Sequence, residues 1–178
     1  SIVWFDAYMS NVDRTARNTN LLLWHKRLWL IDHGASLYFH HSPTWTADIA
    51  ARARDPFAMI KEHVLLRFAG SLKQADELLA PRVTPELIAD IVGMIPDAWL
   101  HDSASAVTAQ RQDYARYLEA RIASPRAFAE EAKGGCRVAR HRQEAGNRRA
   151  LGCPSVGALA LPATPALLDH ERREQRER

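Results

Sequence analysis

The sequence predicts a mainly α-helical fold with one short β-hairpin near its N-terminal end. Between residues 57 and 122, apolar residues recur at intervals of three and four, which is the spacing of one face of an α-helix. Earlier in the chain, two four-residue apolar runs, Leu21–Trp24 and Leu28–Ile31, are separated by the polar triplet HKR at residues 25–27, a pattern typical of a hairpin. We therefore expect a helical domain that contains this single pair of strands.

The N-terminal part of the chain divides into a helix, a loop and the hairpin. Residues 1–9 are mostly apolar and are expected to form a buried helix that ends near residues 10–11. Residues 13–20 show no apolar periodicity, so we expect them to form a loop. The hairpin follows and is closed by Asp32-His33-Gly34, where the glycine permits backbone angles that other residues disfavour.

Further helices are expected after the hairpin. The clearest start lies at Thr84 and Pro85, because threonine is a good N-cap and proline suits the first helical position. Pro96 is expected to end this helix. The expected helices are Phe57–Phe68, Ser71–Leu79, the segment 85–95, Thr108–Ile122 and a short one that begins at Ser124-Pro125.

The composition changes sharply at Lys133, which divides the chain into residues 1–132 and residues 133–178. The first part holds 14 Lys and Arg against 16 Asp and Glu, and the second holds 10 against 5. The second part also lacks Phe, Trp, Tyr, Ile and Met, so it has little apolar surface to offset the entropy of ordering. We expect residues 1–132 to form the folded domain and residues 133–178 to form a basic, disordered tail with a helical end at Leu167–Arg176. The abrupt change also raises the hypothesis that the tail comes from a shifted reading frame.

Charge and composition narrow the classes of function. Because the excess of basic residues lies in the tail, the folded part carries no strong signal for nucleic-acid binding. No apolar run approaches the roughly 20 residues that span a bilayer. The two cysteines, Cys136 and Cys153, are too few for a disulfide framework or a zinc site, so we expect a soluble, cytoplasmic protein. The chain opens without an initiator Met on an apolar segment, which indicates a piece of a longer protein.

Residues 13–34 combine the side chains that phosphoryl transfer from ATP requires. Asp13 and Asn18 are spaced as D-x-x-x-x-N in the expected loop, and Asp32 follows the hairpin. Phosphoryl transfer needs a carboxylate to orient the attacking hydroxyl, and oxygen ligands to hold magnesium against the phosphates. The first loop supplies a carboxylate and an amide oxygen, and the second supplies another carboxylate. The apolar hairpin is expected to be packed rigidly and so to fix the distance between the loops.

This arrangement resembles the catalytic loop and the metal-binding Asp-x-Gly of protein kinases, and it is most similar to the HipA-like kinase family. The segments DRTARN and IDHG carry the resemblance, which extends over WFDAYMSNVDRTARNTNLLLWHKRLWLIDHGASLYFHH, EHVLLRFAGSLKQADELLAP, IPDAWL and YARYLEARIASPRAFAEEA. It covers about residues 1–132 and includes a more distant similarity to phosphatidylinositol 3- and 4-kinases. The resemblance implies a helical, kinase-like C-terminal lobe with a short hairpin between the catalytic loop and the metal-binding loop.

The resemblance also implies roles for individual residues. Asp13 occupies the position of the catalytic base, and Arg14 lies where related loops place an arginine near the transferred phosphate. Asn18 and Asp32 occupy the positions of the magnesium ligands. ATP and Mg²⁺ are therefore the expected cofactors, and a protein Ser or Thr hydroxyl is the expected acceptor. The flanking residues that are assigned no role are Asn20 and His33.

A working kinase also needs a glycine-rich loop and a strand lysine that grip the nucleotide. Neither is recognisable in the sequence, and Gly134-Gly135 lacks the strand–helix context of a phosphate loop. We therefore expect a truncated HipA-like kinase without its N-terminal lobe, which is inactive alone.

Two other interpretations remain open. The chain could be a non-catalytic, kinase-derived helical module that serves protein interaction. It could also be a metal hydrolase that uses Asp32 with His33, His40 and His41. Against the hydrolase, neither an H-x-x-x-H nor an H-E-x-x-H spacing occurs, and the adjacent His40 and His41 would point to opposite faces of a strand.

Overall fold

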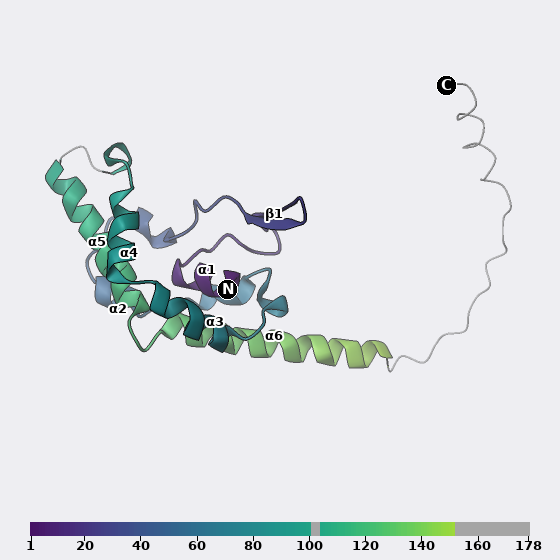
Figure 1. Cartoon of the computed structure of the whole chain (residues 1–178). Helices are drawn as coiled ribbons and strands as arrows, with labels where there is room; N and C mark the ends of the chain where they lie inside the picture. The colour runs from purple at the N-terminus through teal and green to yellow at the C-terminus, as the bar shows by residue number, and fades with distance from the viewer. Residues whose placement is uncertain (101–103, 152–178) are drawn as a thin grey trace, which may run out of the picture. The chain divides into compact units, whose positions relative to one another are not determined.

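The computed structural model of this protein describes residues 1–100 and 104–151, and the chain divides into two compact units, residues 1–145 and residues 146–178. The described part is mainly helical and contains a two-stranded antiparallel sheet, as the sequence predicts (Figure 1). Its α-helices are α1 (Ile2–Tyr8), α2 (Ile49–Ala53), α3 (Leu72–Leu79), α4 (Pro85–Gly93), α5 (Ala104–Ile122) and α6 (Ala127–Leu151). Its 3₁₀ helices are η1 (Tyr38–His41), η2 (Ala58–Glu62), η3 (Leu66–Phe68), η4 (Ala80–Arg82) and η5 (Asp97–Trp99).

Helix α1 contributes the centre of the hydrophobic core. Trp4 and Tyr8 are buried and stack with their ring centroids 5.7 Å apart, and the ring of Phe128 from α6 lies 5.5 Å from that of Trp4. The indole N–H of Trp4 donates a hydrogen bond to Asp76 of α3 at 2.8 Å. A helix of seven residues is not stable in isolation, so α1 is helical because of these tertiary contacts.

Helices α3 and α4 begin at side-chain caps. The hydroxyl of Ser71 accepts a hydrogen bond from the backbone N–H of Gln74 at 3.1 Å, and that of Thr84 accepts one from Leu87 at 3.2 Å. Such caps satisfy backbone N–H groups that the first turn of a helix leaves free. Pro85 is the first residue of α4, so the predicted start of this helix is confirmed.

The predicted hairpin is also confirmed. Strand β1 (Leu21–Trp24) pairs with β2 (Arg27–Leu30), and Leu21 lies opposite Leu30. The second strand begins and ends one residue earlier than the apolar run predicts. His25 and Lys26 form the connection with φ angles of 48° and 60°, and positive φ at both central residues is the geometry of a tight type I′ hairpin turn.

Most apolar side chains of the hairpin are exposed, so the prediction that it is packed rigidly is wrong for this chain. In Figure 1 the hairpin extends outward from the helices. A two-stranded ribbon has two faces, and among its strand residues only Leu21 and Leu30, at the base, are partly buried. The exposed residues are Leu22, Leu23, Trp24, Leu28, Trp29 and Ile31, and Leu23 is 72% exposed.

Residues 57–68 do not form the continuous helix that their apolar spacing predicts. They form η2 and η3, and His63 between them is extended, with φ −63° and ψ 125°. The backbone N–H of Val64 donates to the carbonyl of Arg14 at 3.0 Å, and His63 forms an antiparallel bridge with Thr15. A continuous helix would use these backbone groups internally. Pairing with the loop after α1 therefore replaces the helix.

Helix α6 is much longer than the short helix predicted to begin at Ser124-Pro125, because it spans 25 residues. Residues 133–151 are helical in the structure, whereas the composition predicts a disordered tail from residue 133. The compact unit also extends to Ala145, beyond the boundary predicted at residue 132. The predicted helical end at Leu167–Arg176 lies outside the described residues.

Small residues allow α6 to pack against the rest of this unit without large apolar side chains. Ala132 and Cys136 are buried. At Gly135, an added Cβ would come within 3.2 Å of the side chain of Leu66. Alanine and arginine, which are common in this segment, also favour helix formation. The prediction of a disordered tail rested on its lack of large apolar residues, and that criterion does not detect packing through small residues.

The side chain of Arg121 on α5 binds the C-terminal end of α1. Arg121 is 1% exposed, and it donates hydrogen bonds to the carbonyls of Ala7 and Tyr8, both at 2.8 Å. It also donates to the carbonyls of Ala53 at 3.1 Å and Asp55 at 2.9 Å. The last carbonyls of a helix have no partner within the helix and attract positive charge. Arg121 thus joins α5, α1 and the end of α2.

Replacing Arg121 by Met should lower the free energy of unfolding by about 3–5 kcal/mol, because several buried carbonyls lose their donors. Arg121→Lys should give a smaller loss, since lysine keeps the charge but cannot reach the same set of carbonyls. Urea unfolding followed by tryptophan fluorescence measures both. The matched control is Arg116→Met on the same helix, whose side chain is 64% exposed and whose effect should stay within about 0.5 kcal/mol. Equal losses at the two positions would contradict the role of Arg121.

Candidate functional site

The loop between α1 and the hairpin brings three of its polar side chains together. The side-chain amide of Asn18 donates to Oδ2 of Asp13 at 2.7 Å, and that of Asn20 donates to the same oxygen at 3.1 Å. Within the described residues, neither Oδ1 of Asp13 nor Oδ1 of Asn18 takes part in a hydrogen bond. The loop therefore orients one carboxylate through two amides and leaves two hard oxygen atoms available.

Asp32 follows strand β2 at the base of the hairpin and meets this loop through Asn20. The side-chain amide of Asn20 donates to the backbone carbonyl of Asp32 at 3.4 Å. Asp32 has a positive φ of 49°, and its Oδ1 accepts the backbone N–H of Gly34 at 3.3 Å. An added Cβ at Gly34 would lie 3.4 Å from this oxygen. The structure thus brings the two loops predicted to carry Asp13, Asn18 and Asp32 next to each other.

Arg14 points into the protein and not toward the exposed side of the loop. Its side chain is fully buried, its Nε donates to Oδ2 of Asp6 at 2.6 Å, and its Nη1 donates to the carbonyl of Asn20. Its Nη2 atom is buried and has no hydrogen-bond partner in the part of the chain that the structure describes. The resemblance implies that Arg14 lies near a transferred phosphate, whereas the structure encloses its guanidinium, which holds the loop.

Sequence reasoning missed the buried groups behind the loop, Asp6 and His63. Asp6 on α1 is 0% exposed, and it accepts hydrogen bonds from Arg14, from Nε2 of His63 at 2.9 Å and from the amide of Asn11 at 3.1 Å. The Nδ1 atom of His63 accepts the backbone N–H of Leu65 at 3.0 Å. With Nδ1 acting as an acceptor, Nε2 carries the proton that His63 donates to Asp6.

This environment changes the pKa of Asp6. Burial alone would raise the pKa of the carboxyl group, but the hydrogen bonds from His63 and Arg14, the positive charge of Arg14 and the hydrogen bond from Asn11 together lower it below its ordinary value. The signal that could have identified this group is a carboxylate inside a helix that is otherwise apolar, since buried carboxylates are rare unless they are paired.

The histidine arrangement differs from the expectation that His40 and His41 point apart. Both lie in the 3₁₀ helix η1, not on a strand, and their Nε2 atoms are 3.1 Å apart. The Nδ1 atom of His40 also lies 3.1 Å from the hydroxyl of Tyr114, and burial together with the neighbouring His41 lowers the pKa of His40. Among the described residues, no three His, Cys, Asp or Glu side chains are placed to hold one metal ion. The two imidazoles thus have no third ligand of these types in that part of the chain.

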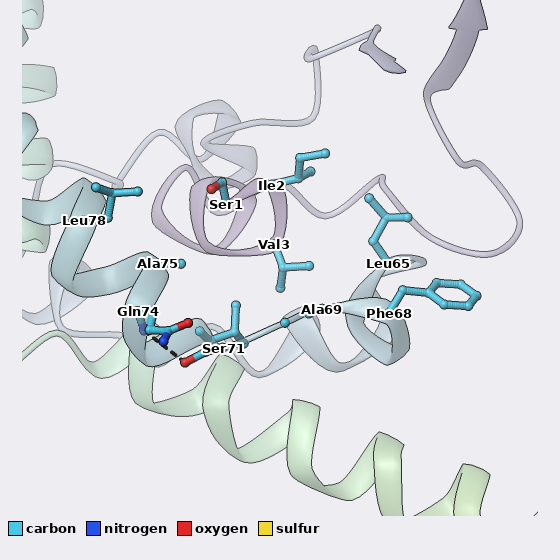
Figure 2. A pocket seen from close by; sticks show the side chains of 12 residues that line it. Ser1, Ile2, Val3, Leu65, Phe68, Ala69, Ser71, Gln74, Ala75 and Leu78 are labelled. Carbon is cyan, nitrogen blue, oxygen red and sulfur yellow. Dashed lines mark hydrogen bonds between the residues drawn. The ribbon is translucent and has the colours of Figure 1, made fainter. Parts of the chain in front are cut away.

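A separate hollow of about 600 Å³ lies between α1, η3 and α3. Figure 2 shows that its wall is mostly apolar, with Ile2 and Val3 on one side and Leu65 and Phe68 on another. None of its lining residues belongs to the loops around Asp13 or Asp32. The hollow is therefore distinct from the polar site.

Searches of protein families, of curated proteins and of solved structures found no match for this chain. Within residues 1–100 and 104–151, no helix is both long and apolar enough to cross a membrane.

Acid should weaken the folded state through Asp6. Because its pKa is lower in the folded protein than its ordinary value of 3.8, the unfolded chain binds more protons near that pH. The contribution of Asp6 to stability is therefore present above about pH 4 and is lost as the pH falls through the folded pKa. At pH 6, Asp6→Asn should lower the free energy of unfolding by about 3–5 kcal/mol, because Arg14 loses its buried partner.

Urea unfolding at pH 6, 5, 4 and 3 tests this. The stability of Asp6→Asn should fall less steeply below pH 4 than that of the wild type. The exposed Asp90→Asn on α4 removes the same charge and should follow the wild-type curve. Parallel curves for wild type and Asp6→Asn would show that Asp6 does not carry this dependence.

Proposed function

We propose that residues 13–34 form the base-and-metal half of a phosphotransfer site of the HipA-like kinase type. The observation that carries this proposal is the pair of hydrogen bonds from Asn20, which join the carboxylate of Asp13 to the loop of Asp32. A site of this type transfers the γ-phosphate of ATP to a hydroxyl with the help of Mg²⁺. In the family that the chain resembles, the acceptor is a protein serine or threonine.

The donor atoms at the site suit magnesium. Mg²⁺ prefers hard oxygen ligands and usually takes only one or two from protein side chains, the others coming from water and phosphate. Oδ1 of Asn18 and the carboxylate of Asp32 are such ligands, and both residues are exposed. When bound, the ion would neutralise charge on the phosphates of ATP.

Asp13 is the residue suited to act on the acceptor hydroxyl. Its Oδ2 is occupied by the two amides, whereas its Oδ1 has no hydrogen-bond partner among the described residues. A carboxylate held in this way can accept a hydrogen bond from a substrate hydroxyl and orient it for attack. Arg14 acts behind this group, because its contacts with Asp6 and Asn20 hold the loop.

A non-catalytic interaction module is the second candidate. It is favoured by the exposed apolar side chains of the hairpin, since contiguous exposed apolar surface often marks a site of protein contact. Binding of magnesium and nucleotide at residues 13–34 distinguishes the two candidates, because an interaction module does not need it.

Adding Mg²⁺ and a non-hydrolysable ATP analogue to the ¹⁵N-labelled chain should shift the amide NMR signals of residues 13–20 and 31–34. We expect a dissociation constant on the order of 1 mM, because the described residues include no element that grips the nucleotide. Asp32→Asn should weaken binding about tenfold or more by removing a metal ligand. Asp90→Asn on the exposed face of α4 makes the same change of charge elsewhere and should bind like the wild type. A wild-type chain whose signals at these two loops do not move would refute the proposal.

The chain alone should transfer almost no phosphate. The described residues hold neither a glycine-rich phosphate loop nor a lysine on a strand, and both are parts of a working kinase. Incubation with radiolabelled ATP, Mg²⁺ and casein should therefore give the same incorporation for the wild type as for Asp13→Asn. Incorporation by the wild type that disappears in Asp13→Asn would show that the chain carries a complete site.

A further inference from the structure

We infer that Asn20 is a positioning residue that sets the separation between the Asp13 loop and the Asp32 loop. This inference rests on the proposed function, because the separation matters only if the two loops act on one magnesium–nucleotide complex. Asn20 touches neither metal nor substrate in this scheme. It acts through the two aspartates that it contacts.

The side chain of Asn20 links the Asp13 loop directly to the Asp32 loop, in addition to backbone hydrogen bonds such as that from Ile31 to the Asn20 carbonyl. Its one amide nitrogen has two N–H groups, which serve two acceptors: Oδ2 of Asp13 at 3.1 Å and the backbone carbonyl of Asp32 at 3.4 Å. Asn20 is 8% exposed, whereas Asn18 is exposed. The donor of the bridge is thus shielded from water, and both of its hydrogen bonds are partly buried.

The backbone of Asn20 is held as firmly as its side chain. Its carbonyl accepts the backbone N–H of Ile31 at 3.1 Å and also accepts Nη1 of Arg14. Arg14 is paired with the buried carboxylate of Asp6. A continuous series of polar contacts therefore runs from α1 through Arg14 to Asn20, and from there to both candidate functional loops.

The backbone conformation explains why asparagine suits this position. Asn20 has a positive φ of 46°, a region that asparagine and glycine adopt much more readily than other residues. Glycine would keep this conformation but would lack the amide. Asn20→Gly therefore removes the bridge without straining the backbone, which separates the positioning role from the role of residue 20 in the turn.

The test compares the full chain carrying Asn20→Gly with a matched control, Thr19→Gly. Thr19 is the adjacent, exposed loop residue, so its replacement adds the same backbone freedom without touching the bridge. The urea midpoints of both variants should stay within about 0.5 M of the wild type. In an NMR titration with Mg²⁺ and the non-hydrolysable ATP analogue, Asn20→Gly should bind about tenfold more weakly, as is usual when a group that orients a metal ligand is lost. Thr19→Gly should bind like the wild type.

A second measurement, made without metal or nucleotide, keeps this inference separate from the proposed function. The ¹⁵N order parameters of the Asp32 and Gly34 amides should fall in Asn20→Gly but not in Thr19→Gly, because only the former frees the carbonyl of Asp32. If the wild-type chain binds neither magnesium nor the nucleotide analogue in the titration, the proposed function is refuted. Unchanged order parameters in Asn20→Gly, or unchanged affinity where the wild type does bind, would overturn the role of Asn20.

Discussion

The buried carboxylate of Asp6 is the interaction on which the arrangement of the site depends. Its partners Arg14, His63 and Asn11 come from the loop, from the segment between η2 and η3, and from the turn after α1. A buried carboxylate is costly unless it is paired and fully hydrogen-bonded. An arrangement that separated these segments would leave the charge unsatisfied. One side chain therefore selects one arrangement of three parts of the chain.

Charged groups also hold the rest of α1, which is too short to be stable alone. Arg121 binds the carbonyls at its C-terminal end. On its other side, Asp76 accepts the indole N–H of Trp4 and binds Arg126 through two hydrogen bonds of 2.9 and 3.0 Å. Bidentate contacts of this kind restrict geometry more than single ones. The core helix is thus oriented by polar contacts as well as by its apolar face.

Local chemistry was sufficient to predict the elements that depend on it. The caps at Ser71 and Thr84 act within three residues of themselves, so a short stretch of sequence contains all the information they need. The hairpin was predictable from its two apolar runs, although His25 and Lys26 are not the asparagine and glycine usually found in such turns. The one-residue error in β2 arose there, because the length of the turn is not encoded by the apolar pattern.

What could not be predicted depends on partners distant in the chain. The apolar spacing of residues 57–68 indicates a helix, but it contains no information that Val64 will pair with Arg14, 50 positions away by their residue numbers. The inward direction of the Arg14 side chain likewise depends on Asp6, which lies outside the D-x-x-x-x-N pattern. The pattern D-x-x-x-x-N placed Asp13 and Asn18 in one loop, yet it could not show which of the intervening side chains would turn inward.

The register of the hairpin connects the fold to the candidate site. The bond from the N–H of Ile31 to the carbonyl of Asn20 continues the ladder one pair beyond Leu21 and Leu30. The bridge to Asp32 therefore forms at the base of the hairpin, next to its last pair. A slip of one residue would displace one strand by about 3.3 Å, a distance as long as the hydrogen bonds themselves. The strand register at the base thus places the carbonyl of Asp32 within reach of the side-chain amide of Asn20.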